Sequence, residues 1–152
     1  MESALFVSWY CQDKLRGCLG SLNSVSLRTG MSHYALSSAL EDTRFPPLKQ
    51  KDFKKSTCNV NLLHSFVKCE DWNDWSLGCH GVIVQYKDYK ATFLPHVAPA
   101  QEWTKEETIR AALLKAGCDQ HMSNIGDCTV TRYSSQADSL DYKDWYASKN
   151  GN

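Results

Sequence analysis

The first apolar run of the chain predicts a buried strand. Residues 4–10, Ala-Leu-Phe-Val-Ser-Trp-Tyr, form a short stretch rich in aromatic and β-branched side chains, a composition typical of strands rather than helices. A polar turn at 12–14 follows, and after it comes the hexapeptide Leu-Arg-Gly-Cys-Leu-Gly at 15–20.

Later segments of the chain also have strand patterns. Residues 57–67 alternate between two faces, which is typical of a half-exposed strand. The β-rich runs 82–86 and 91–94 flank a four-residue polar turn at 87–90 and therefore predict a hairpin. A further strand is expected at 128–133. In the alternating strand, one face carries Cys58, Val60 and Leu62, and the other carries Asn59, Asn61 and Leu63.

A helix is expected before the sequence Phe45-Pro46-Pro47. Apolar side chains in this region recur at the i, i+3 and i+4 spacing of one helix face, and either Ser24 or Ser26 is a candidate N-cap. The helix ends at Phe45, because a residue that precedes proline is driven out of the α region. The apolar face consists of Met31, Tyr34, Ala35, Leu36, Ala39 and Leu40.

The clearest helix spans residues 104–116. Thr104 and Glu107 form a capping box that satisfies free amides at its start, and Gly117 stands where the residue after a helix adopts positive φ. Its buried stripe is Ile109, Ala112, Leu113 and Ala116. A short helix is also expected from about Asp141. Strands joined by hairpins, with two or three helices, predict an α+β fold with an antiparallel or mixed sheet and flanking helices.

Length, charge and cysteine content narrow the class of function. A chain of 152 residues is long enough for one domain. Its 17 basic and 17 acidic residues cancel, which argues against a nucleic-acid partner, and no apolar run is long enough for a membrane span. Seven cysteines without a secretory signal indicate reduced thiols in the cytoplasm or nucleus. No CxxC pair or HExxH motif is present, so neither a metal nor a cofactor is expected.

The hexapeptide carries the most suggestive chemistry in the chain. Gly17 and Gly20 allow the backbone to approach a ligand closely. Arg16 beside Cys18 favours a thiolate, and its guanidinium can hold a carboxylate or a phosphate. The alternative is structural, with the glycines shaping a strand end and Cys18 acting as a small buried hydrophobe.

Other side chains have a functional and a structural interpretation as well. His80, directly before a predicted strand, is a candidate base for Cys18, or it packs a turn. Arg44 either lines a ligand cleft or pins its loop through a carboxylate. Trp72 and Trp75 either form a partner-binding patch or seal the edge of a core.

Several segments occur in the order typical of the AMMECR family, which is named after the Alport syndrome, intellectual disability, midface hypoplasia and elliptocytosis chromosomal region. They include LRGCLG at 15–20, YALSSALEDTRFPPL at 34–48, CNVNLLHSF at 58–66, GCHGVIVQY at 78–86 and ATFLPHVAPAQEW at 91–103. The chain resembles this family over about residues 5–146, with Leu19 in place of the usual isoleucine. The resemblance implies an intracellular α+β protein with a larger and a smaller subdomain, and a hexapeptide near the cleft between them. It also implies that residues 1–152 form a single domain without the helical segment that usually precedes the first strand.

Two functional hypotheses follow from the residues and the resemblance. The first is an intracellular binding or regulatory module with an unidentified protein or small-molecule partner, and with its cleft at the hexapeptide. The residues expected to contact the ligand are Arg16, Gly17, Gly20 and Arg44. The alternative is an enzyme that acts on a small anionic metabolite, with Cys18 as the nucleophile, His80 as the base and glycine amides stabilising an oxyanion.

Overall fold

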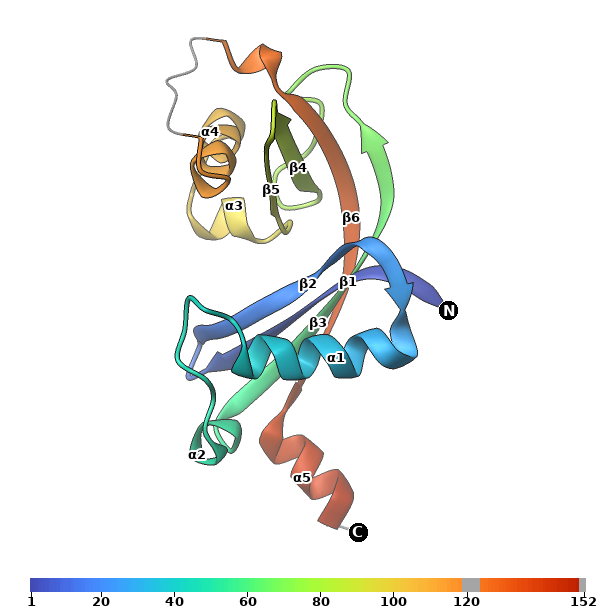
Figure 1. Cartoon of the computed structure of the whole chain (residues 1–152), viewed down its shortest axis with the longest axis vertical. Coiled ribbons are helices and arrows are strands. Elements are labelled where there is room, and N and C mark those ends of the chain that lie inside the picture. The colour runs from blue at the N-terminus through green and yellow to red at the C-terminus, as the bar shows by residue number, and fades with distance from the viewer. Residues whose placement is uncertain (119–123, 151–152) are drawn as a thin grey trace. The chain divides into compact units, whose positions relative to one another are not determined.

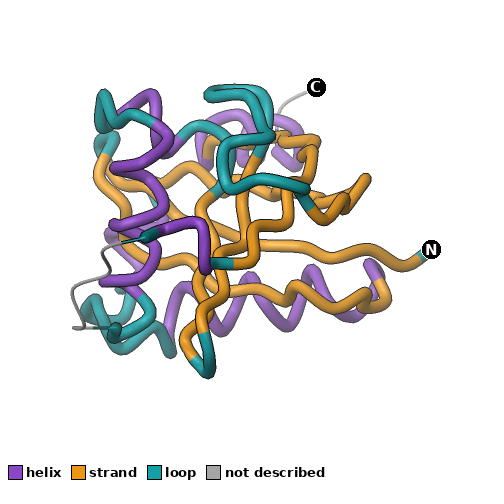
Figure 2. The backbone as a smooth tube through the Cα atoms, turned by 90° about the horizontal axis from the view of Figure 1, so that it is seen from above, coloured by secondary structure: helices purple, strands orange, loops and turns teal. Residues whose placement is uncertain are grey.

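The computed structural model describes residues 1–118 and 124–150, and it shows an α+β fold (Figure 1). The strands are β1 (Glu2–Cys11), β2 (Lys14–Ser26), β3 (Ser56–Lys68), β4 (Gly81–Tyr86), β5 (Tyr89–Phe93) and β6 (Thr129–Asp141). The helices are α1 (Leu27–Leu40), α2 (Gln50–Phe53), α3 (Val97–Ala100), α4 (Lys105–Lys115) and α5 (Tyr142–Asn150), with a 3-10 turn at Ile125–Asp127. Figure 2 traces these strands and helices along the backbone. The predicted fold class is confirmed.

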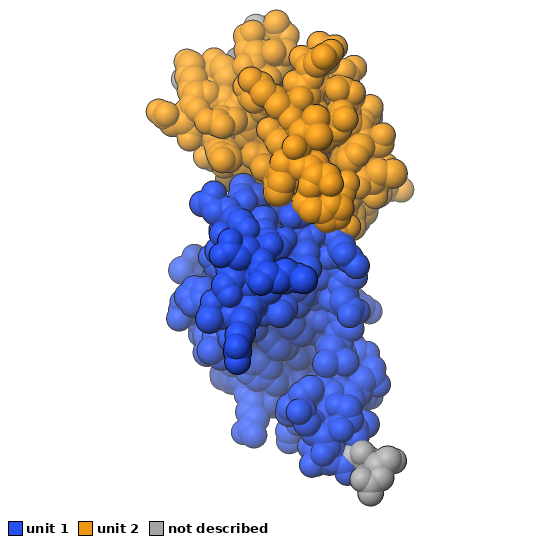
Figure 3. All heavy atoms as spheres, turned by 90° about the vertical axis from the view of Figure 1, so that its right-hand side faces the viewer, with its two compact units in different colours: residues 1–63, 136–152 blue, residues 64–135 orange. Residues whose placement is uncertain are grey.

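The strands form one sheet in the order β2-β1-β3-β6-β4-β5. β1 pairs antiparallel with β2 and β3, and β4 pairs antiparallel with β5 and β6. The chain divides into two compact units, shown in two colours in Figure 3. Unit 1 comprises Met1–Leu63 and Gln136–Asn152, and unit 2 comprises His64–Ser135. β3 and β6 each contribute residues to both units.

In unit 1, α1 packs on β1 and β2 through small side chains. Its buried residues are Gly30, Ser37, Ser38 and Ala39. The prediction that Met31, Leu36 and Leu40 belong to a buried face is wrong, because these side chains are 39%, 64% and 46% exposed. The helix lies so close to β2 that only small residues fit between them, and the large side chains point away.

β3 alternates as predicted, and its more polar face is the buried one in unit 1. Asn61 and Leu63 are buried, whereas Cys58, Val60 and Leu62 are only partly covered. In β1, Leu5 and Val7 are fully buried beneath α1. Helix α1 thus covers the β1 and β2 part of its sheet face and leaves the apolar side of β3 accessible.

Unit 2 follows the sequence predictions closely. Tyr86 pairs with Tyr89, so the β4–β5 hairpin turns through two residues, Lys87 and Asp88, rather than the four expected. Helix α4 begins with the predicted Thr104–Glu107 capping box. Gly117 follows it with a φ of +89°. The core of the unit consists of Trp75, Val82, Val84, Ile109, Ala112, Leu113 and Val130, with further buried residues around them.

The strand expected at 128–133 begins at Thr129 and continues to Asp141, where α5 starts as expected. The second half of β6, from Gln136, belongs to unit 1, and all of its side chains there are exposed. Nothing in the local pattern of Ser134–Asp141 marks it as strand, since most of its side chains are polar and exposed.

Candidate ligand-binding site

The hexapeptide lies within β2, an edge strand of the sheet, and not at a strand end as one interpretation held. Cys18 stands opposite Ser8 of β1. The register then shifts, because Trp9 pairs with Gly17 whereas Tyr10 pairs with Leu15. The residue left over is Arg16, so the irregularity is a β-bulge that redirects the Arg16 side chain.

Both glycines of the hexapeptide permit close approaches within the chain itself. A Cβ atom on Gly17 would lie 1.8 Å from the carbonyl oxygen of Ser38 in α1. A Cβ atom on Gly20 would lie 2.1 Å from the Leu5 carbonyl oxygen and 2.6 Å from the Phe6 Cα atom. Packing against α1 and β1 therefore accounts for these glycines, and their contact with a ligand stays a prediction.

Asp42 and Arg44 brace the edge of β2 at Cys18. The Cys18 amide donates to Asp42 Oδ2 at 3.0 Å, and Arg44 Nη2 donates to the Cys18 carbonyl oxygen at 3.2 Å. Arg44 also holds the Asp42 carboxylate through Nε at 3.0 Å and Nη2 at 2.8 Å. Because an edge strand exposes unpaired amide and carbonyl groups, these two side chains take the place of a neighbouring strand.

The Asp42 carboxylate and the Arg44 guanidinium stabilise each other. The side chain of Asp42 is 3% exposed, whereas that of Arg44 is 53% exposed. The hydrogen bonds from Arg44, helped by the Cys18 and Arg44 amides, outweigh desolvation and lower the pKa of Asp42 to about 2. The same hydrogen bonds raise the pKa of Arg44. Arg44 thus acts as the structural pin that one interpretation expected, and its contact with a ligand stays a prediction.

The Cys18 thiol and His80 have different hydrogen-bond partners. The half-buried Cys18 Sγ atom accepts a hydrogen bond from the Ser8 hydroxyl at 3.2 Å in unit 1. In unit 2, His80 precedes β4, and its Nδ1 atom accepts a hydrogen bond from the Ser76 amide at 3.0 Å. His80 therefore closes a turn, and its pairing with Cys18 stays a prediction.

Arg16 has long contacts within unit 1. Its guanidinium lies 3.5 Å from the Pro46 carbonyl oxygen and 3.9 Å from Asp52 Oδ1. Asp52 accepts a hydrogen bond from the Lys49 amide at 2.8 Å. That bond lowers the pKa of Asp52, as do the nearby charges of Arg16, Lys51 and Lys49. Arg16, Lys49 and Lys51 are close enough to act on one carboxylate, and they form what we call the basic edge.

The tryptophan loop belongs to the core of unit 2. Trp75 is 4% exposed and its Nε1 atom donates to the Trp72 carbonyl oxygen at 2.8 Å. Trp72 packs against the same core. The structural interpretation of these tryptophans is confirmed, and the loop offers no apolar docking patch.

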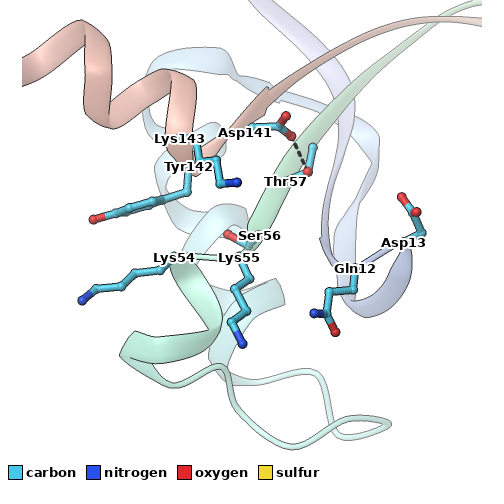
Figure 4. Close-up of a pocket in the computed structure, with 9 residues that line it drawn as sticks. All are labelled: Gln12, Asp13, Lys54, Lys55, Ser56, Thr57, Asp141, Tyr142 and Lys143. Carbon is cyan, nitrogen blue, oxygen red and sulfur yellow. Dashed lines mark hydrogen bonds between the residues drawn. The ribbon is translucent and has the colours of Figure 1, made fainter. Parts of the chain in front are cut away.

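A pocket of about 420 Å³ in unit 1 carries charges of both signs (Figure 4). Lys54, Lys55 and Lys143 line it together with Asp13 and Asp141. The Asp141 carboxylate accepts a hydrogen bond from the Thr57 hydroxyl, which ties the end of β6 to β3. Two carboxylates offset the three lysines of this pocket, whereas one carboxylate, that of Asp52, offsets the three basic side chains of the basic edge, which is therefore the better anion site.

Within residues 1–118 and 124–150, no three His, Cys, Asp or Glu side chains gather as metal ligands. No helix in those ranges is long and apolar enough to cross a membrane.

Sequence reasoning missed Asp42 and Ser8 as members of the site. The Asp-x-Arg spacing after a predicted helix indicates a local ion pair, but it does not show that Asp42 reaches the Cys18 amide 24 residues away. The position of Ser8 on the first strand becomes informative only once the register with β2 is known.

Comparison with known proteins gives consistent matches along most of the chain. Residues 1–137 match the sequence profile of the AMMECR1 family. An uncharacterised protein of Arabidopsis thaliana is 35% identical over 93% of this chain and 72% of its own length. One of Saccharomyces cerevisiae is 33% identical over 95% of this chain and 70% of its own length. The crystal structure of an uncharacterised Pyrococcus horikoshii protein has the same fold, with a TM-score of 0.80 at 24% identity over 93% of this chain and 75% of its own.

Proposed function

This chain is a member of the AMMECR1 family, and we propose that residues 1–152 act as one binding module rather than as a thiol enzyme. Its ligand carries an anionic group, which binds at the basic edge beside the hexapeptide. The observation that carries the proposal is the position of Arg16, which follows a β-bulge and shares one carboxylate, that of Asp52, with Lys49 and Lys51.

The geometry of Arg16 supports an anion site. Charge-assisted hydrogen bonds from arginine normally measure about 2.7–2.9 Å, so the Arg16 contacts with Pro46 and Asp52, at 3.5 and 3.9 Å, are longer than a well-formed arginine–anion pair. A guanidinium offers five donors in a fork that matches carboxylate and phosphate oxygens. Its side chain is 23% exposed, so a ligand can reach it from solvent.

The hydrogen bonds that Cys18 and Arg44 make within the chain favour a binding role over a catalytic one. The amide and carbonyl of Cys18 are both occupied by the Asp42–Arg44 brace. Its sulfur accepts a hydrogen bond from Ser8. Three polar groups of this residue thus serve to fix β2, as expected of a rigid support for a neighbouring contact residue.

The absence of disulfides among the seven cysteines of the described residues supports a location in the cytoplasm or nucleus. All seven cysteines lie in the described ranges, and none of them is in a disulfide. Free thiols in this number persist in compartments where glutathione and thioredoxin keep them reduced.

A titration with inorganic phosphate and pyrophosphate, followed through backbone amide NMR signals, tests the proposal. We expect the largest shifts at Arg16, Lys49 and Lys51, and a loss of affinity of about tenfold in Arg16→Gln, as expected for one charge-assisted contact. Arg28→Gln is the matched control, because Arg28 is an exposed arginine on α1. Shifts confined to other surfaces, or equal losses in both variants, would overturn the proposal.

The alternative function is a Cys18-dependent enzyme for a small anionic metabolite. The Ser8 hydroxyl favours it, because its hydrogen bond to the Cys18 sulfur orients that atom. Such an enzyme loses turnover in Cys18→Ser while it keeps its affinity for the anion. The binding module has no turnover to lose.

A further inference from the structure

Unit 1 contains an apolar groove beside α1. Its floor is the partly covered face of β3, with Cys58, Val60 and Leu62, and its two sides are the start of α1 and residues 136–140 of β6. The groove has a volume of about 670 Å³. A second cavity of about 320 Å³ shares Cys58 and Leu140 with it and is also lined by Trp9 and Phe53, and by Tyr142 and Trp145 of α5 in the same chain.

This groove exists because α1 covers only part of its sheet face. α1 packs on β1 and β2, and its Met31 side chain, 39% exposed, stands at the side of the groove. Leu140 of β6 is 50% exposed on the other side. Contiguous apolar surface of this kind on a folded domain marks an interaction site.

The same chain carries an exposed amphipathic helix, α5. It follows β6 directly and extends from the end of that strand (Figure 1). Trp145 is 42% exposed and Tyr146 is 52% exposed, and both rings pack on Tyr142 with centroid distances of 5.5 and 5.9 Å. The aromatic stripe at i, i+3 and i+4 is the pattern of a helix that docks into a groove.

We propose that a second copy of this chain fills the apolar groove, with α5 of each copy lying in the groove of the other. The sizes match. A helix of nine residues is about 14 Å long, and the β3 floor from Cys58 to Leu62 spans about 14 Å. Each chain carries both the groove and the helix. In a dimer with two-fold symmetry, the contact between α5 and the groove therefore forms twice.

The charges of the groove and of α5 are consistent with this occupant. The groove side presents the exposed carboxylate of Asp138, and the last turn of α5 presents Lys149.

Sedimentation equilibrium over a range of protein concentrations tests the proposal. We expect the wild-type mass to rise from monomer to dimer, and Met31→Asp and Tyr146→Asp to remain monomeric at every concentration. Both substituted residues are exposed, so the monomer keeps its fold. Leu36→Asp is the matched control, because Leu36 is 64% exposed on α1 but outside the groove, and it should dimerise like the wild type.

A charge-swap experiment separates α5 exchange from other dimers. Asp138→Lys and Lys149→Glu should each weaken the dimer several-fold, and the double variant should regain most of the wild-type affinity. A wild-type chain that stays monomeric at the highest concentration overturns the proposal and points to a foreign helix as the occupant. A dimer that survives both Met31→Asp and Tyr146→Asp overturns it too.

Discussion

Replacing Gly17 with alanine tests the packing of α1 against the hexapeptide. The new Cβ atom would meet the Ser38 carbonyl oxygen at 1.8 Å and the Ser38 carbonyl carbon at 2.8 Å. These are backbone atoms in a helix, so they cannot rotate away as a flexible side chain can. To reach an ordinary contact distance, α1 must withdraw from β2 by at least about 1 Å.

The expected cost follows from two opposing effects. Overpacking of this kind destabilises a protein by about 3 kcal/mol. Alanine recovers somewhat less than 1 kcal/mol, because it reduces the conformational freedom of the unfolded chain. We therefore expect Gly17→Ala to lower the free energy of unfolding by about 2 kcal/mol.

Urea unfolding followed by tryptophan fluorescence measures this change. Trp9 reports on the helix position directly, because its Nε1 atom donates to the Ala35 carbonyl oxygen of α1 at 2.9 Å. Gly30→Ala is the control, since its Cβ atom would meet only the Val25 and Leu5 side chains at 3.0 and 3.1 Å. A loss below about 0.5 kcal/mol for Gly17→Ala, or an equal loss for the control, would refute the reasoning.

Three further predictions concern other parts of the chain. The pKa of Asp42 in the folded protein, about 2, lies below the ordinary 3.8, so its contribution of about 2 kcal/mol is present above pH 4 and disappears as the pH falls to about 2. Unfolding free energies across that range should fall less steeply in Asp42→Asn than in the wild type. Thr104→Ala removes the cap of α4, and it should cost about 1 kcal/mol in urea unfolding; an unchanged value contradicts the role of the cap. Burial raises the pKa of Cys58 to about 11, so mass spectrometry should show exposed Cys79 alkylated before Cys58 at neutral pH, and the opposite order contradicts the burial of Cys58.

The sequence predicts elements whose determinants are local. The Thr104–Glu107 capping box and Gly117 lie within one helix and its ends, so they locate α4 without knowledge of the rest of the chain. The first strand is equally clear, because its apolar run is continuous and ends at a polar turn. The fold class follows from the order of such elements.

The orientation of α1 and the brace at Cys18 depend on non-local contacts. Helical periodicity predicts Leu36 and Leu40 on an apolar face, but the close approach at Gly17 selects Ser37, Ser38 and Ala39 as the buried side. A pattern along one helix carries no information on how near the neighbouring strand lies. The sequence does not predict which face of β3 is exposed, for the same reason: alternation defines two faces of a strand but does not show which one is covered.

The phosphate affinity of Cys18→Ser tests the central claim most directly. If the domain binds its ligand through Arg16 and uses Cys18 to fix β2, the variant should bind within about twofold of the wild type, a difference of less than 0.5 kcal/mol. Arg16→Gln, measured beside it, should lose about tenfold. Affinity lost in Cys18→Ser and kept in Arg16→Gln would contradict the account and make the thiol itself the contact group.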